Sequence, residues 1–297
     1  MTAADVDRAL TDEKSLLITW LNRGTLHLVT SEDYPWLFAL TARRQLPWIE
    51  RRLMQLGVTR DRAEKAVTVI EATLASEGPL TRSQLRDRIA ARGVATDGQA
   101  FIHQVALASL RGLVIRGPTR GREQCFVLTR DWLGRAPRAA PEDVDRALAE
   151  LARRYLAGHG PATDRDLAIW AGLPLRDVRS GLRAIASELV ERANGLVDLA
   201  GRSDPPELPG PRLLGPFDPL LHGWASREPI VGAHGSLVTS NGIFRPILLV
   251  NGRAVGTWSL QARRVELRPF EDLDQGTMVA LESDGREVVR YLGTAGG

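Results

Sequence analysis

Apolar positions in residues 1–50 change from the spacing of a helix to the alternation of strands, and back again. Residues 5–13 have a helical pattern. The runs Leu16–Leu21 and Thr25–Val29 then flank the turn Asn22-Arg23-Gly24, which is typical of a β-hairpin, and Ser31-Glu32-Asp33 precedes another helical pattern. Because a winged-helix unit has about three helices before its hairpin, this opening predicts only the later part of such a unit.

Residues 51–135 have the pattern of a complete winged-helix unit. Three helical patterns come first, and two short apolar runs around a turn follow them. In order, the helices are expected from Asp61 to Ser76, from Thr81 to near Gly93 and from Thr96 or Asp97 to Leu110, and the strands over Leu113–Arg116 and Cys125–Leu128. The turn Gly117–Glu123 is rich in Gly, Pro and Arg, and it is the expected wing.

A short repeat marks a second copy of this plan. Gly, Pro, Thr and Leu occur at the same offsets in Gly78–Leu85 and Gly160–Leu167. In each copy a helical pattern ends at Gly-Pro, and a Thr follows that can cap a new helix, with Gln84 or Asp166 three positions later. Helix, break and capped helix are the start of a helix-turn-helix, so the sequence predicts tandem nucleic-acid-binding units.

The chain changes character towards its C-terminus. Ile247–Val250 and Ala254–Trp258 flank Asn251-Gly252, a strong hairpin signal, and Arg263–Leu267 and Val288–Leu292 are expected to extend the sheet. The predicted fold class is therefore α+β and helix-rich, with tandem winged-helix domains and a β-rich C-terminal subdomain. The expected parts are a partial first unit at 1–50, a second at 51–135, a third at 141–203 and the C-terminal subdomain at 211–297.

Composition excludes several classes of protein. The chain has 297 residues, no run of about 18 apolar residues and no signal-peptide pattern at its N-terminus, so we expect a cytoplasmic, nucleoid-associated protein without a membrane partner. A single cysteine, Cys125, excludes an internal disulfide framework and a cysteine-cluster metal site. Glycine-rich phosphate loops and metal-ligand histidine spacings do not occur. We expect no metal and no cofactor.

The local clustering of basic residues is more informative than their total number, because the formal net charge is only +3. The wing turn is expected to carry Arg116, Arg120 and Arg122 on an exposed loop, where they could contact phosphates or enter a minor groove. A solvated turn without a ligand is the alternative.

Two predicted helices carry further polar side chains. The third helix of the 51–135 unit has Gln99, His103 and Gln104, which can form hydrogen bonds to base edges or phosphates. In the later unit, arginines spaced by three and four form one basic face, namely Arg176, Arg179 and Arg183. A solvated helix face would explain each pattern as well, so both interpretations stay open.

Several longer motifs resemble one known family. They are Arg23–Val29, Arg154–Thr163 with Trp170 and Gly172-Leu173, Phe217-Asp218-Pro219, and Phe244-Arg245-Pro246 with Val250–Trp258. In this order they resemble the winged-helix DNA-binding family that includes the AlkZ-like DNA glycosylases, of the azinomycin-resistance type. The resemblance extends over nearly the whole chain, and it adds Arg23, Thr25, His27 and Arg245 to the candidate DNA-binding residues.

The resemblance implies tandem winged-helix domains around a concave DNA-binding surface. For active members it also implies hydrolysis of the N-glycosidic bond of bulky N7-alkylated purines, including those in interstrand crosslinks. The alkyl cation already makes the base a good leaving group, so such a protein needs mainly to bind the lesion and position a water molecule. Neither metal nor cofactor is implied.

One family feature has no counterpart in this sequence. The catalytic motif of the family, Gln-apolar-Gln or Gln-apolar-Asp, precedes the segment that resembles Arg23–Val29, and none of the residues before Arg23 is glutamine. We therefore name no catalytic residue. The expectation is that the catalytic segment is absent, so that either the true start lies upstream of Met1 or this member binds DNA without that chemistry.

The sequence thus favours a monomeric protein that binds double-stranded DNA, with alkylated or crosslinked duplex as a possible form of that partner. An active DNA-repair glycosylase is the first alternative. The second is a transcriptional regulator, although no dimerisation helix is recognisable for the two-fold symmetric binding typical of that class.

Overall fold

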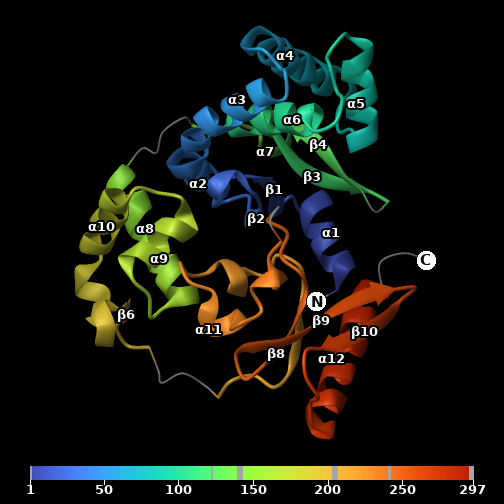
Figure 1. The fold of residues 1–297 in the computed structure, drawn as a ribbon. Helices are drawn as coiled ribbons and strands as arrows, with labels where there is room; N and C mark the ends of the chain where they lie inside the picture. Colours follow the sequence, from blue (N-terminus) through green and yellow to red (C-terminus); the bar gives the residue numbers. More distant parts are fainter. Residues whose placement is uncertain (1, 122, 139–142, 203–206, 240–241, 294–297) are drawn as a thin grey trace. The chain divides into compact units, whose positions relative to one another are not determined.

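The computed structural model describes residues 2–121, 123–138, 143–202, 207–239 and 242–293 (Figure 1). The chain forms two compact units. The N-terminal unit comprises residues 5–151 and 171–184, and the C-terminal unit comprises residues 1–4, 152–170 and 185–297. Helices and antiparallel sheets occur together, so the expected α+β fold class is confirmed.

The N-terminal unit contains most of the helices. Its elements are α1 (Ala3–Thr11), β1 (Leu16–Trp20), β2 (Leu26–Thr30), α2 (Tyr34–Thr41), α3 (Leu46–Gln55), α4 (Arg60–Glu77), α5 (Arg82–Ala91), α6 (Ala100–Leu110), β3 (Val114–Arg120), β4 (Glu123–Leu128), α7 (Thr129–Leu133) and α10 (Leu175–Ala184). One helix, α8 (Val144–His159), begins in this unit and continues into the other.

Both hairpins expected in this unit are present, and they belong to a single sheet. The four strands are ordered β2-β1-β3-β4 and all neighbours are antiparallel. The two hairpins meet where Ile18 of β1 pairs with Arg116 of β3. The division into separate units at 1–50 and 51–135 stays a prediction, but their strands form one sheet.

Helix α6 forms the centre of the hydrophobic core of this unit. Its sequence is apolar on nearly every side, which is typical of a fully buried helix. It packs on β1 and β3 and beside α3 and α4 (Figure 1). The core that surrounds it extends from Leu17 of β1 to Leu128 of β4.

The predicted wing turn and the predicted start of α6 were wrong by several residues. Strand β3 continues through Gly117 to Arg120, where Arg120 still pairs with Glu123, so the turn is shorter than expected. Helix α6 starts at Ala100 rather than after Thr96 or Asp97. The physical reason is Gly98, whose φ of +53° forms a turn that delays the helix.

The repeated Gly-Pro-x-Thr segments form the predicted capping boxes. The Thr81 Oγ1 accepts a hydrogen bond from the Gln84 N–H, and the Gln84 Oε1 accepts one from the Thr81 N–H. In the second copy, Asp166 and Thr163 exchange the same two bonds at 2.9 and 3.1 Å. Each box satisfies two backbone N–H groups at the start of α5 or of α9 (Asp164–Ala171).

The C-terminal unit combines two hairpin-containing sheets with helices. Besides α9, its elements are β5 (Leu189–Glu191), β6 (Val197–Leu199), β7 (Arg212–Leu214), α11 (Glu228–Val231), β8 (Ile247–Val250), β9 (Arg253–Gln261), β10 (Arg264–Pro269) and α12 (Gln275–Gly293). Strands β5 and β6 form a minimal hairpin, and the other sheet has the order β10-β9-β8-β7.

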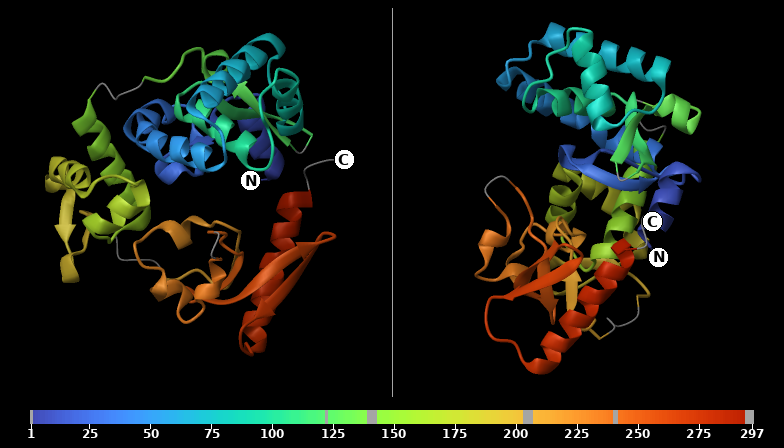
Figure 2. Two further views of the ribbon diagram at one scale, coloured as in Figure 1. Left: turned by 45° about the horizontal axis from the view of Figure 1, so that its top comes forward. Right: turned by 90° about the vertical axis from the view of Figure 1, so that its right-hand side faces the viewer.

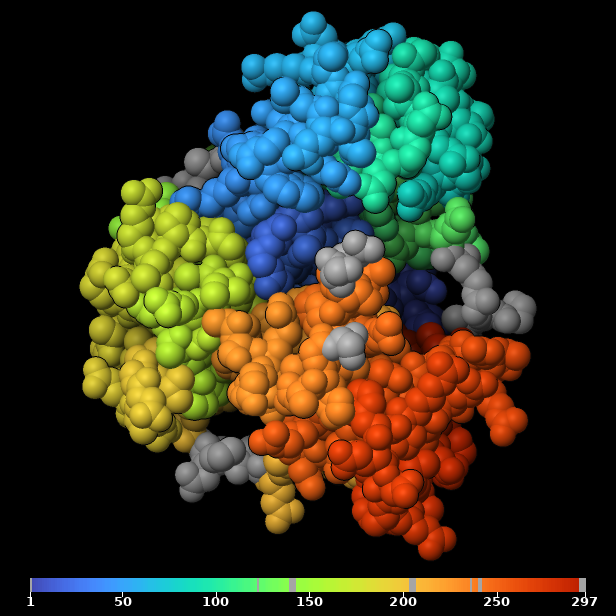
Figure 3. All heavy atoms as spheres, in the orientation of Figure 1, coloured from blue at the N-terminus to red at the C-terminus, as the bar shows by residue number. Residues whose placement is uncertain are grey.

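The long helix α12 packs on β7 and β10 of the larger sheet (Figure 2). In the space-filling view, the C-terminal part of the chain forms the orange-to-red region of the visible surface (Figure 3). The expectation that Val288–Leu292 extends the sheet was wrong, because these residues belong to α12. Leu281 and Gly285, one helical turn apart, are the buried positions of α12, which shows the helical period of the whole segment. A short apolar run cannot distinguish the two structures by itself.

A matched pair of glycines tests the helix packing. A Cβ built on Gly181 of α10 would lie 2.4 Å from the backbone oxygen of Leu148 in α8, whereas a Cβ on the exposed Gly158 of α8 meets nothing within 4 Å. We expect Gly181→Ala to lower the free energy of unfolding by about 1–3 kcal/mol, as overpacking does. Gly158→Ala, which only improves helix propensity, is expected to raise it by up to about 1 kcal/mol. Urea unfolding of both variants measures this; equal effects would contradict the close contact of α8 and α10.

Candidate nucleic-acid interface

The turn of the first hairpin, at Arg23 and Gly24, packs closely against the Trp48 ring of α3. Arg23 has a φ of 57° and Gly24 a φ of +70°. A Cβ on Gly24 would lie 3.3 Å from the Trp48 ring of α3, and a Cβ on Gly172 would lie 3.1 Å from the Cγ of Arg23. Glycines at positions 24 and 172 therefore permit the close approach of the turn to its neighbours.

On the strand that leaves this turn, Thr25 is exposed and His27 is half-buried. The Thr25 Oγ1 donates to the Asn22 carbonyl at 3.1 Å. The His27 Nδ1 lies 2.9 Å from the carbonyl oxygen of Thr25, and since a carbonyl can only accept, Nδ1 carries the proton in this geometry. Burial, together with the nearby Arg23 charge, lowers the pKa of His27. The neutral ring therefore has its Nε2 lone pair available as a hydrogen-bond acceptor.

The start of α6 meets α3 beside the same aromatic ring. The Arg52 Nη2 donates to the Gln99 Oε1 at 2.7 Å, and the Trp48 and His103 rings lie edge to face at 6.1 Å between centroids. Burial and the Arg52 charge lower the pKa of His103. Trp48 contacts Gly24 and His103, and Arg52, one turn further along α3, bonds to Gln99, so we name Gly24, Trp48, Arg52, Gln99 and His103 the hairpin-turn cluster.

Helix α10 presents the predicted row of arginines to solvent. Arg176, Arg179 and Arg183 are all exposed, while Val178 and Gly181 are buried on the other side of the helix. The Arg176 side chain is 84% exposed, although its Nε lies 3.2 Å from the Asp177 carboxylate. Arg44 makes the closer ion pair with Asp177, at 2.7 Å. The row is therefore a basic helix face, as its spacing indicated.

The predicted wing arginines have different environments. Arg120 is exposed and lies at the end of β3. The expectation of an exposed loop was wrong for Arg116, which belongs to β3 and is half-buried because the strand continues past it. Arg122 lies outside the described residues. Gln104 is also not available as a contact, since it is buried and its Nε2 donates to the Ala95 carbonyl at 3.1 Å.

Arg245 belongs to the other unit and lies just before β8. Its side chain is exposed, and its backbone N–H donates to the Leu237 carbonyl at 3.0 Å. The preceding Phe244 is buried against His222, with 4.0 Å between ring centroids, and it carries the Arg227 guanidinium 5.0 Å from its ring. Phe244 thus anchors the segment that presents Arg245.

Sequence reasoning missed Trp48, Arg52 and Arg44, which all lie on α3 or in the turn before it. For α3 the available signal was the helical spacing of Ile49 and Leu53, the two buried residues, which leaves Trp48 and Arg52 off the buried side. Among the described residues, no group of three or more His, Cys, Asp or Glu side chains is arranged to hold a metal ion. No helix in the described ranges is long and apolar enough to cross a membrane.

A curated relative and a solved structure each match nearly the whole chain. The Interstrand DNA cross-link repair glycosylase of Streptomyces sahachiroi is 28% identical over 314 residues, which cover 98% of this chain and 82% of the relative. The solved structure of Streptomyces sahachiroi DNA glycosylase AlkZ superimposes with a TM-score of 0.75 at 24% identity, and it covers 98% of this chain and 82% of its own. That likeness shows a shared fold.

A family model described as DNA glycosylase AlkZ-like matches residues 1–291. The match includes the hairpin turn, α6, α10 and the segment around Arg245. The resemblance that the sequence motifs indicated is thereby confirmed, and this chain belongs to the AlkZ-like DNA glycosylase family.

Proposed function

We propose that this protein binds double-stranded DNA through the N-terminal unit, with the arginine row of α10 as the main phosphate contact. The observation that carries the proposal is the exposure of Arg176, Arg179 and Arg183 on one helix face. Three guanidinium groups on one face can each contact a phosphate oxygen of a duplex. The hairpin-turn cluster supplies hydrogen-bonding groups and an exposed tryptophan in the same unit.

The order of elements supports a winged-helix interpretation of this binding. Helices α4, α5 and α6 precede the β3–β4 hairpin, as the helices of a winged helix precede its wing. We propose that Gln99 and His103 at the start of α6 and the end of the hairpin at Arg120 face the duplex, while the rest of α6 stays buried in the core, and that the protein acts as a monomer at the nucleoid. Its relative is named as a cross-link repair glycosylase, which supports alkylated or crosslinked duplex as the preferred partner.

Salt dependence tests the phosphate contacts. Fluorescence anisotropy with a duplex at several salt concentrations should show a linear fall of log K with log salt. Replacing Arg176, Arg179 and Arg183 together with Gln is expected to weaken binding and to reduce the slope by about 2.7, since each lost contact contributes about 0.9.

The control is a second triple variant, which loses the same three positive charges from the C-terminal unit. Arg212, Arg268 and Arg290 belong to the unit that the proposal does not place on the DNA, so their joint replacement with Gln is expected to leave the slope unchanged. Binding that does not depend on salt, or equal slopes for the two triple variants, would contradict the proposal.

Glycosidic bond hydrolysis is the second candidate function, and family membership favours it. An N7-alkylated purine leaves readily, so the reaction requires a positioned water molecule more than a strong nucleophile. The sequence contains no Gln-apolar-Gln or Gln-apolar-Asp triplet. Our leading proposal is therefore lesion binding without turnover by this chain.

A product assay distinguishes binding from turnover. A duplex with one N7-methylguanine is incubated with the chain, and abasic sites are then cleaved with alkali and counted on a gel. We expect abasic sites to form at the rate of the protein-free sample, because the glutamine motif is lacking. Formation of abasic sites above that rate would reject binding without turnover and establish the glycosylase activity.

A further inference from the structure

One arginine of the wing hairpin is half-buried without a counter-charge. The Nε of Arg116 is buried and has no hydrogen-bond partner. Its guanidinium carbon lies 5.2 Å from the Trp20 ring centroid and 5.0 Å from that of Phe126. Across the described ranges of the chain, no carboxylate lies within 4.0 Å of its nitrogens. The two rings offset part of the cost of removing this cation from water, and an anion would supply the ionic partner that it lacks.

The sheet register brings a second arginine to the same place. Arg116 pairs with Phe126 of β4, and Phe126 exchanges both backbone hydrogen bonds with Leu80, at 2.8 and 3.0 Å. Side chains opposite one another in antiparallel strands lie on the same face of the sheet. Leu80 is followed by the cap Thr81 and by Arg82, the first residue of α5, so the first turn of α5 starts beside Arg116.

Burial and the positive charge of Arg82 both affect the pKa of the Arg116 guanidinium. Burial lowers the pKa of Arg116, and the Arg82 charge lowers it further. Like-charged groups placed together destabilise each other unless an anion lies between them. The capping box uses the N–H groups of Thr81 and Gln84, and the N–H groups of Arg82 and Ser83 that it leaves add positive potential at this point.

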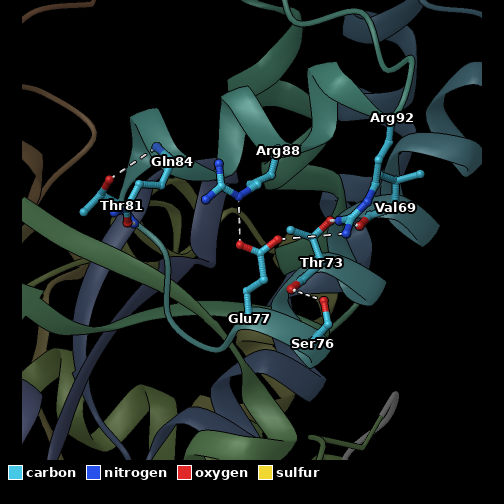
Figure 4. A network of polar contacts seen from close by, with 8 residues as sticks. All are labelled: Val69, Thr73, Ser76, Glu77, Thr81, Gln84, Arg88 and Arg92. Carbon is cyan, nitrogen blue, oxygen red and sulfur yellow. Dashed lines mark hydrogen bonds and ion pairs between the residues drawn. The ribbon is translucent and has the colours of Figure 1, made fainter.

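The other arginines of α5 or its C-terminal end, unlike Arg82, lie close to a carboxylate. Arg88 bonds to Glu77 at 2.8 Å, and Arg92 approaches the same carboxylate at 3.9 Å (Figure 4). Arg86 lies 3.7 Å from the carboxylate of Asp87. Arg82 is exposed and has no such partner among the described residues. Of these four arginines, only the one beside Arg116 lacks a carboxylate within 4.0 Å.

We propose that Arg82, Arg116 and the first turn of α5 form a binding site for a phosphate group. Guanidinium groups bind phosphate oxygens through paired hydrogen bonds, and aromatic rings on both sides hold Arg116 in place for this. The phosphate can belong to a nucleic-acid backbone or be free in solution. Its assignment to duplex DNA rests on the proposed function; the anion site itself does not.

The first arm of the test uses inorganic phosphate and the whole chain. The unfolding temperature is measured in rising phosphate against sodium chloride of equal ionic strength. We expect phosphate to stabilise the wild type, and Arg82→Gln to weaken this apparent affinity about tenfold, the effect of one lost hydrogen bond to a charged group. Arg116→Met, which keeps the packing between the rings, should do the same. Arg88→Gln is the matched control on the same helix and should behave as wild type.

The second arm uses duplex DNA and the salt slope. Arg82→Gln and Arg116→Met should each reduce the slope by about 0.9, and Arg88→Gln should not. Phosphate protection without a slope change identifies free phosphate as the ligand. If the wild type fails to bind DNA but phosphate protection depends on Arg82, the site stands and the proposed function fails.

One combination of results in the two arms would reject the proposed phosphate site. No phosphate protection, with equal DNA slopes for Arg82→Gln and Arg88→Gln, rejects the phosphate site even if the wild type binds DNA. Because Arg82 is exposed, its variant decides the question should Arg116→Met fail to fold.

Discussion

The antiparallel pairing of β1 with β3 is the constraint on which the N-terminal unit depends. Through the register of Ile18 with Arg116, it joins two hairpins that are each local in sequence into one sheet. An isolated two-stranded hairpin is only marginally stable in water. Four strands instead present a broad apolar face, which α6 covers, and one hydrophobic core surrounds that helix. The positions of the hairpin turn, α6 and the wing all follow from this shared sheet.

The pairing of β1 with β3 also determines the surroundings of the Arg116 guanidinium. Arg116 lies at the junction of the two hairpins, so it has Trp20 of β1 on one side and Phe126 of β4 on the other. Neither ring offers a counter-charge, whereas Arg88 and Arg92 of the adjacent helix converge on Glu77. The ion pairs of Glu77 with Arg88 and Arg92 hold α5 on α4, whereas the Arg116 guanidinium beside them has no ionic partner in the described part of the chain. A ligand gains most binding energy from a partly buried polar group of this kind, whose hydrogen bonds are not yet made.

Local sequence signals predicted local structure well. The hairpins, the capped starts of α5 and α9 and the basic face of α10 depend on contacts within a few residues, and all were predicted. The start of α6, the length of β3 and the helical state of Val288–Leu292 were not. The length of β3 and the helical state of Val288–Leu292 depend on packing against a distant element, which a short window of sequence does not contain. The start of α6 was missed for a local reason, the turn at Gly98.

The sequence by itself therefore determined the hairpins and the capped helix starts, the fold class and the family to which the chain belongs, because turns, caps and motifs are encoded in consecutive residues. Tertiary structure alone decided which polar groups act together. The close approach of Gly24 to Trp48, the bond of Arg52 to Gln99, and the strand pairing that brings the start of α5 beside Arg116 join residues from separate elements. The environment of a charge is set by neighbours in space, and long-range strand pairing chooses those neighbours.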